Sequence, residues 1–337
     1  MNVHDAARKC DQILAGVERA MVGKKRELRT VFAAMLAGGH VLIEDNPGLG
    51  KTLLARSFAQ VLGLEFKRVQ FTPDLLPADI TGSFVYNQRS AEFEFRAGPL
   101  FAGLLLADEI NRTPPKTQSA LLEAMQEAQV TVEGRTYRLP EPFHVIATAN
   151  PIEYEGTYTL PEAQLDRFLL RVSIGYPSAD EELEVLSRRV ARRREAISLD
   201  PVTDAAGLME LQHVAESIRV EESVARYCVD LAAATRRHPQ LIVGASPRGA
   251  LALMLVGRAF AMQEGRDYVT PEDVKAIAVS ALSHRVTLQP ENWMRGLSSA
   301  GVIRDVLDHV PVPAAAPETG SDRPITQSQQ GRTAGAR

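Results

Sequence analysis

The segment from Asp45 to Thr52, which reads DNPGLGKT, constrains this chain more than any other feature. It lies between an apolar run at His40–Glu44, typical of a strand, and a helical pattern at Thr52–Leu62. In a glycine-rich loop of this kind, backbone N–H groups and the helix N-terminus wrap a phosphate chain. We expect Lys51 to reach the β- and γ-phosphates and the Thr52 hydroxyl to ligate Mg²⁺. The general pattern has glycine where this chain has Asp45. The residues expected to bind the nucleotide here are Asp45, Asn46, Pro47, Gly48, Leu49, Gly50, Lys51, Thr52 and Leu53.

Two further apolar runs end in polar residues. Leu104–Asp108 is followed by Glu109, and Phe143–Thr148 is followed closely by Asn150. At strand ends beside the phosphate loop, Asp108 would hold Mg²⁺ through water and Glu109 would polarise the attacking water. The Asn150 amide would orient that water or contact the γ-phosphate. The sequence therefore predicts a site that hydrolyses a nucleoside triphosphate with Mg²⁺, with Thr52 and Asp108 as the metal ligands.

Two arginines are candidates for the cation that stabilises charge developing on the γ-phosphate. Arg167, in LPEAQLDRF, lies too far along the chain to belong to the site of its own subunit, so we interpret it as a finger supplied to a neighbour. Arg248, in GASPRGA at the start of a predicted helix, is interpreted as a phosphate sensor. A structural ion pair remains the alternative for both.

The pattern of the chain changes near Pro177. Strand-like runs alternate with helical patterns over 1–177, which predicts an α/β domain with a parallel sheet. Over 178–310 such runs almost disappear, which predicts a helical domain. Its predicted helices are Ser178–Arg194, Glu222–Arg237, Pro247–Gln263 and Pro271–Leu282.

Three smaller segments complete this organisation. Hairpin insertions are predicted at about 83–96 and 129–139, the second with the turn signal Glu133-Gly134. Residues 311–337 contain few large apolar groups and predict a disordered tail.

Composition excludes several classes of protein. The 337 residues carry a net charge of −4 and no basic stripe, which makes nucleic acid an unlikely partner. No apolar run approaches the ~20 residues that cross a bilayer. The seven histidines are scattered without a metal-ligand spacing. Two cysteines, Cys10 and Cys228, do not make a disulfide scaffold, and we expect a cytoplasmic location.

Several longer segments resemble the MoxR-type AAA+ ATPases. They are DNPGLGKT, FTPDLLPADITGSFVY, GPLFAGLLLADEINRTPPKTQSALLEAMQE, VIATANPIEYEGTYTLPEAQLDRF and GASPRGALAL. The resemblance covers roughly Met21 to Arg285. It implies a P-loop NTPase (AAA+) fold, in which a parallel-sheet domain is followed by a smaller all-helical lid domain.

The resemblance also assigns roles to residues. It implies that Asp108 and Glu109 are the Walker B pair, Asn150 is sensor 1, Arg167 the arginine finger and Arg248 sensor 2. Val22 and Gly23 would contact adenine. Segments 72–95 and 129–139 would be the helix-2 insert and the pre-sensor-1 hairpin.

Proteins of this type form hexameric rings and remodel other proteins, often with von Willebrand factor A-domain partners and in cofactor or metal insertion. We therefore expect an oligomeric ATPase with chaperone-like activity. Two alternatives stay open: a slow nucleotide-dependent binding scaffold, and a DNA-acting ring motor, against which the net charge argues. The sequence does not identify the remodelled partner or fix the number of subunits.

Overall fold

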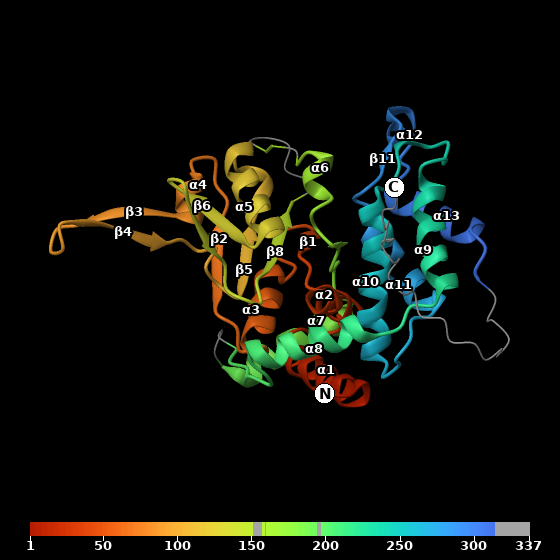
Figure 1. Cartoon of the computed structure of the whole chain (residues 1–337). Coiled ribbons are helices and arrows are strands. Elements are labelled where there is room, and N and C mark those ends of the chain that lie inside the picture. Colours follow the sequence, from red (N-terminus) through yellow and green to blue (C-terminus); the bar gives the residue numbers. More distant parts are fainter. Residues whose placement is uncertain (151–156, 159, 194–196, 314–337) are drawn as a thin grey trace, which may run out of the picture.

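The computed structural model describes residues 1–150, 157–158, 160–193 and 197–313 (Figure 1). The tail predicted for 311–337 lies outside the described residues from 314 onward. Within the described part of the chain, no helix has the length and apolar character needed to span a bilayer.

A parallel five-stranded sheet forms the centre of the first part of the molecule, in the order β2-β5-β8-β1-β9. Its strands are β1 (Val41–Glu44), β2 (Phe66–Gln70), β5 (Leu104–Asp108), β8 (His144–Ala149) and β9 (Leu170–Val172). The central strands β5 and β8 are buried along their whole length, as the apolar runs predict. Because all strands are parallel, the segments that follow β1, β5 and β8 meet at one edge of the sheet.

Helices cover both faces of this sheet. Alternate residues of the strands, such as Leu105 and Val145, pack against α5 (Pro115–Glu127), whereas Leu104 and Ile146 pack against the helices of the other face. Those helices are α1 (Val3–Glu18), α2 (Lys25–Leu36) and α3 (Lys51–Val61). Shorter elements at the sheet edges are α4 (Pro77–Thr81), the 3₁₀ turn Ile110–Arg112 and α6 (Glu162–Leu165).

Both predicted hairpins are present. The first, β3 (Gly82–Asn87) with β4 (Glu92–Ala97), projects from the body on the side away from the C-terminal helices (Figure 1). The second is β6 (Gln129–Val132) with β7 (Arg135–Arg138). The two hairpins touch where the Phe95 ring stacks on the Tyr137 ring, with centroids 4.0 Å apart.

The second part of the chain is mainly helical, as predicted. Its elements are α8 (Ala205–Ser217), α9 (Glu222–Thr235), β10 (Leu241–Val243), α10 (Pro247–Gln263), α11 (Pro271–Leu282), β11 (Thr287–Leu288), α12 (Pro290–Met294) and α13 (Ser299–His309). The α/β class with a helical second part is therefore confirmed. One addition is the short antiparallel pair β10–β11, which the sequence pattern does not reveal.

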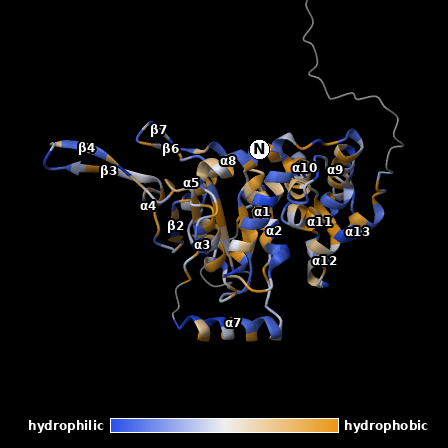
Figure 2. Cartoon of the chain, turned by 90° about the horizontal axis from the view of Figure 1, so that it is seen from below, coloured by the Kyte–Doolittle hydropathy of each residue, from blue (hydrophilic) through white to orange (hydrophobic). Residues whose placement is uncertain are grey.

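Helix α7 (Ala179–Arg192) has the predicted capping box at Ser178 and Glu181, but it lies apart from α9–α13 (Figure 2). None of its side chains, all of them described, is buried. Conversely, α1 and α2 share one apolar core with α10 and other helices of the second part. A division of the chain at Pro177 therefore stays a prediction.

Candidate nucleotide site

The predicted phosphate loop connects β1 to α3. Gly48 and Gly50 adopt left-handed φ values of 84° and 81°, and Gly50 is the N-cap of a helix that begins at Lys51. The unpaired N–H groups of the first helical turn therefore point out of the loop, the arrangement that binds phosphate. The Lys51 ammonium donates a 2.7 Å hydrogen bond to the Asp45 carbonyl, which keeps the cation beside the loop.

Asp45, which departs from the general pattern, joins the loop to the end of β9. Its buried carboxylate accepts a 2.8 Å hydrogen bond from the Ser173 hydroxyl and further bonds from the backbone N–H groups of Ile174 and Gly175. The carboxylate thus turns toward the segment that precedes Tyr176. Asp45 therefore connects the phosphate loop to the segment after β9 and fixes the position of that segment in the site.

A cavity of about 380 Å³ lies beside the loop. Its lining comes from the loop, from the α1–α2 connection, from the segment after β9 and from α7: Ala20, Met21, Val22, Lys24, Pro47, Gly48, Leu49, Gly50, Leu53, Gly175, Tyr176, Pro177, Glu182 and Val185. This volume falls in the range of small-ligand sites. The structure places Val22 in this lining, whereas Gly23 lies behind it, covered by the Glu181 side chain.

The acidic strand end lies at the same edge of the sheet. Asp108 Oδ1 accepts a 2.6 Å hydrogen bond from the buried Thr148 hydroxyl, and that hydroxyl in turn accepts 2.8 Å from the Glu109 backbone N–H. Arg68 donates to Asp108 Oδ2 at 2.7 and 3.1 Å. The carboxylate is therefore held on both oxygens by neighbouring strands.

Glu109 has a left-handed φ of 57°, unusual for a residue with a side chain. This conformation ends β5, and the 3₁₀ turn follows. Its Oε2 accepts hydrogen bonds from Gln70 at 2.7 Å and from Arg112 at 2.9 Å. The side chain of a candidate general base is thus fixed by residues of β2 and of the turn after β5.

Asn150 follows β8 directly, next to the end of β1 in the sheet. It is buried, and its carbonyl accepts a 3.3 Å hydrogen bond from Asn111. The phosphate loop, the acidic pair and Asn150 therefore share the carboxyl edge of three adjacent strands, as the sequence predicts.

These residues fit a magnesium nucleotide. Within the described residues, no cluster of three or more His, Cys, Asp or Glu side chains is placed to hold a metal ion alone. Mg²⁺ in such sites is bound by one or two protein oxygens together with phosphates and water, which the Thr52 hydroxyl and the Asp108 carboxylate can supply.

Arg167 and Arg248 lie elsewhere. Both line a cavity of about 260 Å³ with Gly38, Gly39 and His40, the residues that precede β1. Because the phosphate loop follows β1, the length of that strand separates the two arginines from the loop of their own chain. The structure brings the two arginines together and does not bring either of them to the phosphate loop.

A partly buried junction holds the segments that bear these two arginines. Asp166, next to Arg167, accepts a 2.7 Å hydrogen bond from Arg285 and a 3.0 Å bond from Ser246, the N-cap of α10. Arg285 also donates to backbone carbonyls, including that of Leu169 at 3.0 Å. Burial lowers the pKa of Arg285, while the hydrogen bond that its guanidinium donates to the Asp166 carboxylate opposes that shift.

Several residues of the site were not found from the sequence: Arg68, Gln70, Thr148, Asp166 and Tyr176. Of these, only Thr148 could have been recognised from the sequence, because it is a hydroxyl residue within an apolar strand. The others contact the site from strands or loops whose neighbours are set by the fold.

Comparisons with known proteins agree with this geometry. The model of the ATPase family associated with various cellular activities (AAA) matches residues 40–170, and that of the AAA lid domain matches 233–306. The chain is 49% identical to YeaC of Bacillus subtilis, over 88% of this chain and 92% of that protein. It is 42% identical to Chaperone MoxR1 of Mycobacterium tuberculosis, over 91% of this chain and 84% of that protein. A crystal structure of a Cytophaga hutchinsonii protein assigned as an ATPase superposes with a TM-score of 0.86 at 39% identity, covering 93% of this chain and 97% of that one.

Proposed function

Because the chain belongs to the MoxR family of AAA+ ATPases, we propose that it is an oligomeric, Mg²⁺-dependent ATPase that remodels partner proteins. One observation carries the oligomeric part of this proposal. Arg167 and Arg248 share a cavity at the amino edge of the sheet, whereas the phosphate loop lies at its carboxyl edge. A complete site then needs a second copy of the chain.

Residues of one subunit bind and orient the reactants. The phosphate loop and Lys51 hold the triphosphate, and the cavity beside Val22 and Tyr176 takes the base and sugar. Mg²⁺, held by Thr52 and through water by Asp108, would neutralise charge on the phosphates. Glu109 polarises the attacking water, and Asn150 orients it.

The neighbouring subunit supplies the cations. A guanidinium on the developing γ-phosphate charge stabilises the transition state. The Asp166–Arg285–Ser246 junction fixes the loop of Arg167 to the start of the helix that bears Arg248. Both arginines are therefore presented to the neighbour by one rigid support, with Arg167 as the finger and Arg248 as the sensor.

Such a contact joins two different faces of the same chain, and a head-to-tail interface closes into a ring when its rotation allows. A hexamer is the proposed closure, as the resemblance implies. Remodelling is proposed because the relative MoxR1 is named a chaperone. A partner with a von Willebrand factor A domain, a role in cofactor or metal insertion and a cytoplasmic location belong to the same proposal. A DNA motor does not, since the net charge is −4.

Mixing two inactive variants tests the shared site. Glu109→Gln keeps its finger but has an inactive site, and Arg167→Ala keeps its site but lacks the finger. Each alone should bind ATP. Arg167→Ala should hydrolyse it at least ~10-fold more slowly, because arginine fingers contribute roughly 10³–10⁵ in rate where measured in GTPases. Glu109→Gln should hydrolyse it roughly 10²-fold more slowly or worse, the scale expected for a positioned base. ATPase activity should return when the two proteins are combined at concentrations that allow assembly.

The matched control combines Glu109→Gln with Lys51→Ala. Both keep the finger, but no interface in that mixture has an intact site, so activity should stay absent. The shared site is rejected if mixed oligomers of Glu109→Gln and Arg167→Ala form and remain inactive. Hydrolysis by Arg167→Ala at the rate of the unmodified protein would reject the finger itself.

A further inference from the structure

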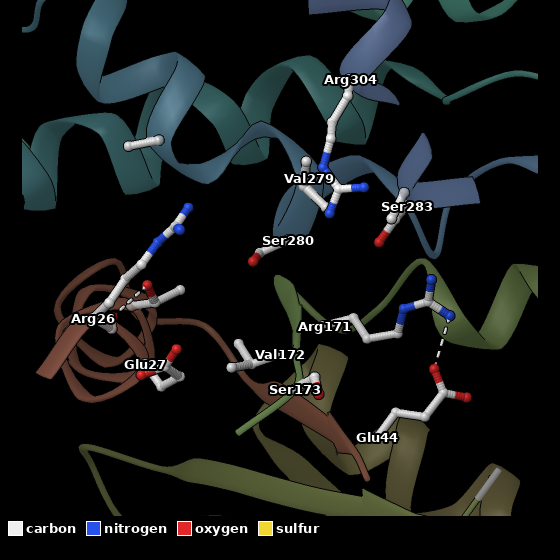
Figure 3. Close-up of a pocket in the computed structure, with 13 residues that line it drawn as sticks. Arg26, Glu27, Glu44, Arg171, Val172, Ser173, Val279, Ser280, Ser283 and Arg304 are labelled. Carbon is white, nitrogen blue, oxygen red and sulfur yellow. Dashed lines mark hydrogen bonds and ion pairs between the residues drawn. The ribbon is translucent and has the colours of Figure 1, made fainter. Parts of the chain in front are cut away.

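A second polar cavity, of about 420 Å³, lies between the α/β part and the last helices of the chain (Figure 3). Its walls come from α2, from the ends of β1 and β9, and from α11 and α13. Within the described residues, its lining contains none of the phosphate loop segment 46–53. It is therefore a different cavity from the nucleotide site.

Three arginines from three elements reach this cavity. Arg26 comes from α2, Arg171 from β9 and Arg304 from α13 (Figure 3). Arg171 is paired with Glu44 at 3.0 Å. Within the described part of the chain, the guanidinium groups of Arg26 and Arg304 form neither a hydrogen bond nor an ion pair.

The remaining polar groups of the lining leave an excess of positive charge. Glu27 and Glu44 are its two carboxylates, and Glu44 is already paired with Arg171. Arg26 and Arg304 therefore face the single further carboxylate of Glu27. Ser280 on α11 and Ser283, which follows that helix directly, add two hydroxyls to the lining.

We propose that this cavity binds a small molecule bearing phosphate groups, which bridges Arg26 and Arg304. A carboxylate is satisfied by one planar guanidinium, whereas a phosphate presents oxygens in several directions and suits donors from opposite walls. Arg26 and Arg304 come from different walls, the Ser280 hydroxyl lies between their side chains, and Ser283 lies on the other side of Arg304, toward Arg171 (Figure 3). The volume exceeds that of one phosphate and admits a diphosphate.

A bound phosphate group would tie α2 to α13, because Arg26 lies on the first of these helices and Arg304 on the second. An anion bound between two guanidinium groups is attracted by both of them. Binding therefore stabilises the junction of the α/β part with the last helices and raises the unfolding temperature.

The test uses the full chain with Lys51→Ala, which weakens the phosphate loop as a competing site. Unfolding temperature and calorimetric affinity are measured with inorganic pyrophosphate, inorganic phosphate and ADP, each against NaCl at equal ionic strength. Pyrophosphate should raise the unfolding temperature. Adding Arg304→Gln or Arg26→Gln should weaken its binding about tenfold or more, the scale of one charge-assisted hydrogen bond.

The control variant is Arg237→Gln, which removes an exposed arginine that does not line the cavity. It should bind pyrophosphate as the Lys51→Ala protein does. ADP binding that depends on Arg304 would identify a nucleotide as the ligand, and binding of pyrophosphate or phosphate alone would identify a free phosphate. The proposal is overturned if none of the three binds, or if binding is unchanged by both Arg304→Gln and Arg26→Gln.

Discussion

The Asp45 carboxylate accepts a 2.8 Å hydrogen bond from the Ser173 hydroxyl, which joins the first residue of the phosphate loop to the segment after β9. The backbone N–H groups of Ile174 and Gly175 donate to the other oxygen of the same carboxylate. Tyr176, the next residue, lines the nucleotide cavity. The Asp45 side chain therefore holds together two parts of the cavity lining, the phosphate loop and the segment after β9.

Replacing Asp45 with the glycine of the general pattern should weaken ATP binding. Asp45→Gly removes the acceptor of three hydrogen bonds, two of them from backbone N–H groups, and lets the segment 173–176 move away from the loop. We expect a loss of about tenfold in nucleotide affinity by calorimetry, the scale of one or two hydrogen bonds to a charged group. Asp45→Asn, which keeps an acceptor oxygen, should lose less. Equal affinity of Asp45→Gly and the unmodified protein would contradict this role.

Thr148 should matter for hydrolysis more than for binding. Thr148→Val keeps the shape of the buried side chain but removes the hydroxyl that joins Asp108 Oδ1 to the Glu109 N–H. Both groups then lose a buried partner, at a cost of roughly 1–3 kcal/mol in unfolding free energy. We expect kcat to fall about tenfold with little change in ATP affinity.

Thr148→Ser is the matched control, since it retains the hydroxyl and should keep most of the activity. Steady-state ATPase rates and direct binding measurements separate the two effects. An unchanged kcat in a folded Thr148→Val protein would show that the link to Asp108 and Glu109 does not support catalysis.

The contact of Phe95 with Tyr137 should hold the base of the projecting hairpin. The rings stack at 4.0 Å with an angle of 14° between their planes, and such pairs contribute about 0.5–1.5 kcal/mol. Tyr137→Ala should therefore speed amide hydrogen exchange of residues 82–97 by up to about tenfold. Tyr86→Ala, at the exposed end of the same hairpin, should leave exchange near Phe95 unchanged. Equal protection of the hairpin base in Tyr137→Ala would contradict the coupling.

Much of the sheet could be predicted because each central strand is a short apolar run that ends in a polar residue. Helices α10 and α11 begin and end where the pattern predicts, since Pro247 and Pro271 occupy their first turns. Strand β9 was missed because its three residues carry no pattern of their own. Its pairing with β1 decides its conformation.

The candidate site divides in the same way. Lys51, Asp108 and Asn150 follow strands, so their meeting at one edge could be predicted from the parallel order. The hydrogen bond between Asp45 and Ser173 could not be predicted, because Ser173 lies 128 residues further along the chain. The cavity between Arg26 and Arg304 was also hidden, since its walls come from distant segments that only tertiary packing brings together.

Two buried histidines should make the protein less stable in mild acid. Burial lowers the pKa of His40 to about 4, with a further contribution from nearby His144, and burial lowers the pKa of His144 to about 4. The neutral rings fit their partners: His40 Nδ1 accepts from the Val145 N–H at 3.0 Å, and His144 Nε2 lies 3.1 Å from the Gln212 amide nitrogen. Protonation would put an N–H on each of these ring nitrogens, which would then face another N–H and lose its hydrogen bond.

The direction of the pH effect follows from these shifts. Well above pH 6.5 these two histidines are neutral in both the folded and the unfolded chain, so they do not make the unfolding free energy depend on pH. As the pH falls from 6.5 toward 4, the unfolded chain binds protons that the folded chain does not, so the unfolding free energy decreases. At pH 5 the loss should be about 2 kcal/mol for each histidine. Urea unfolding at pH 7.5 and pH 5 measures it.

His144→Asn separates this effect from the titration of carboxylates, because the Asn amide nitrogen can replace Nδ1 as the donor to the Gly39 carbonyl. The variant should lose about 2 kcal/mol less than the unmodified protein between pH 7.5 and pH 5. His213→Gln removes an exposed histidine and should show the same decrease as the unmodified protein. An identical decrease in His144→Asn and the unmodified protein would mean that His144 takes up its proton equally in the folded and unfolded chains, and the buried neutral ring would then have no part in acid sensitivity.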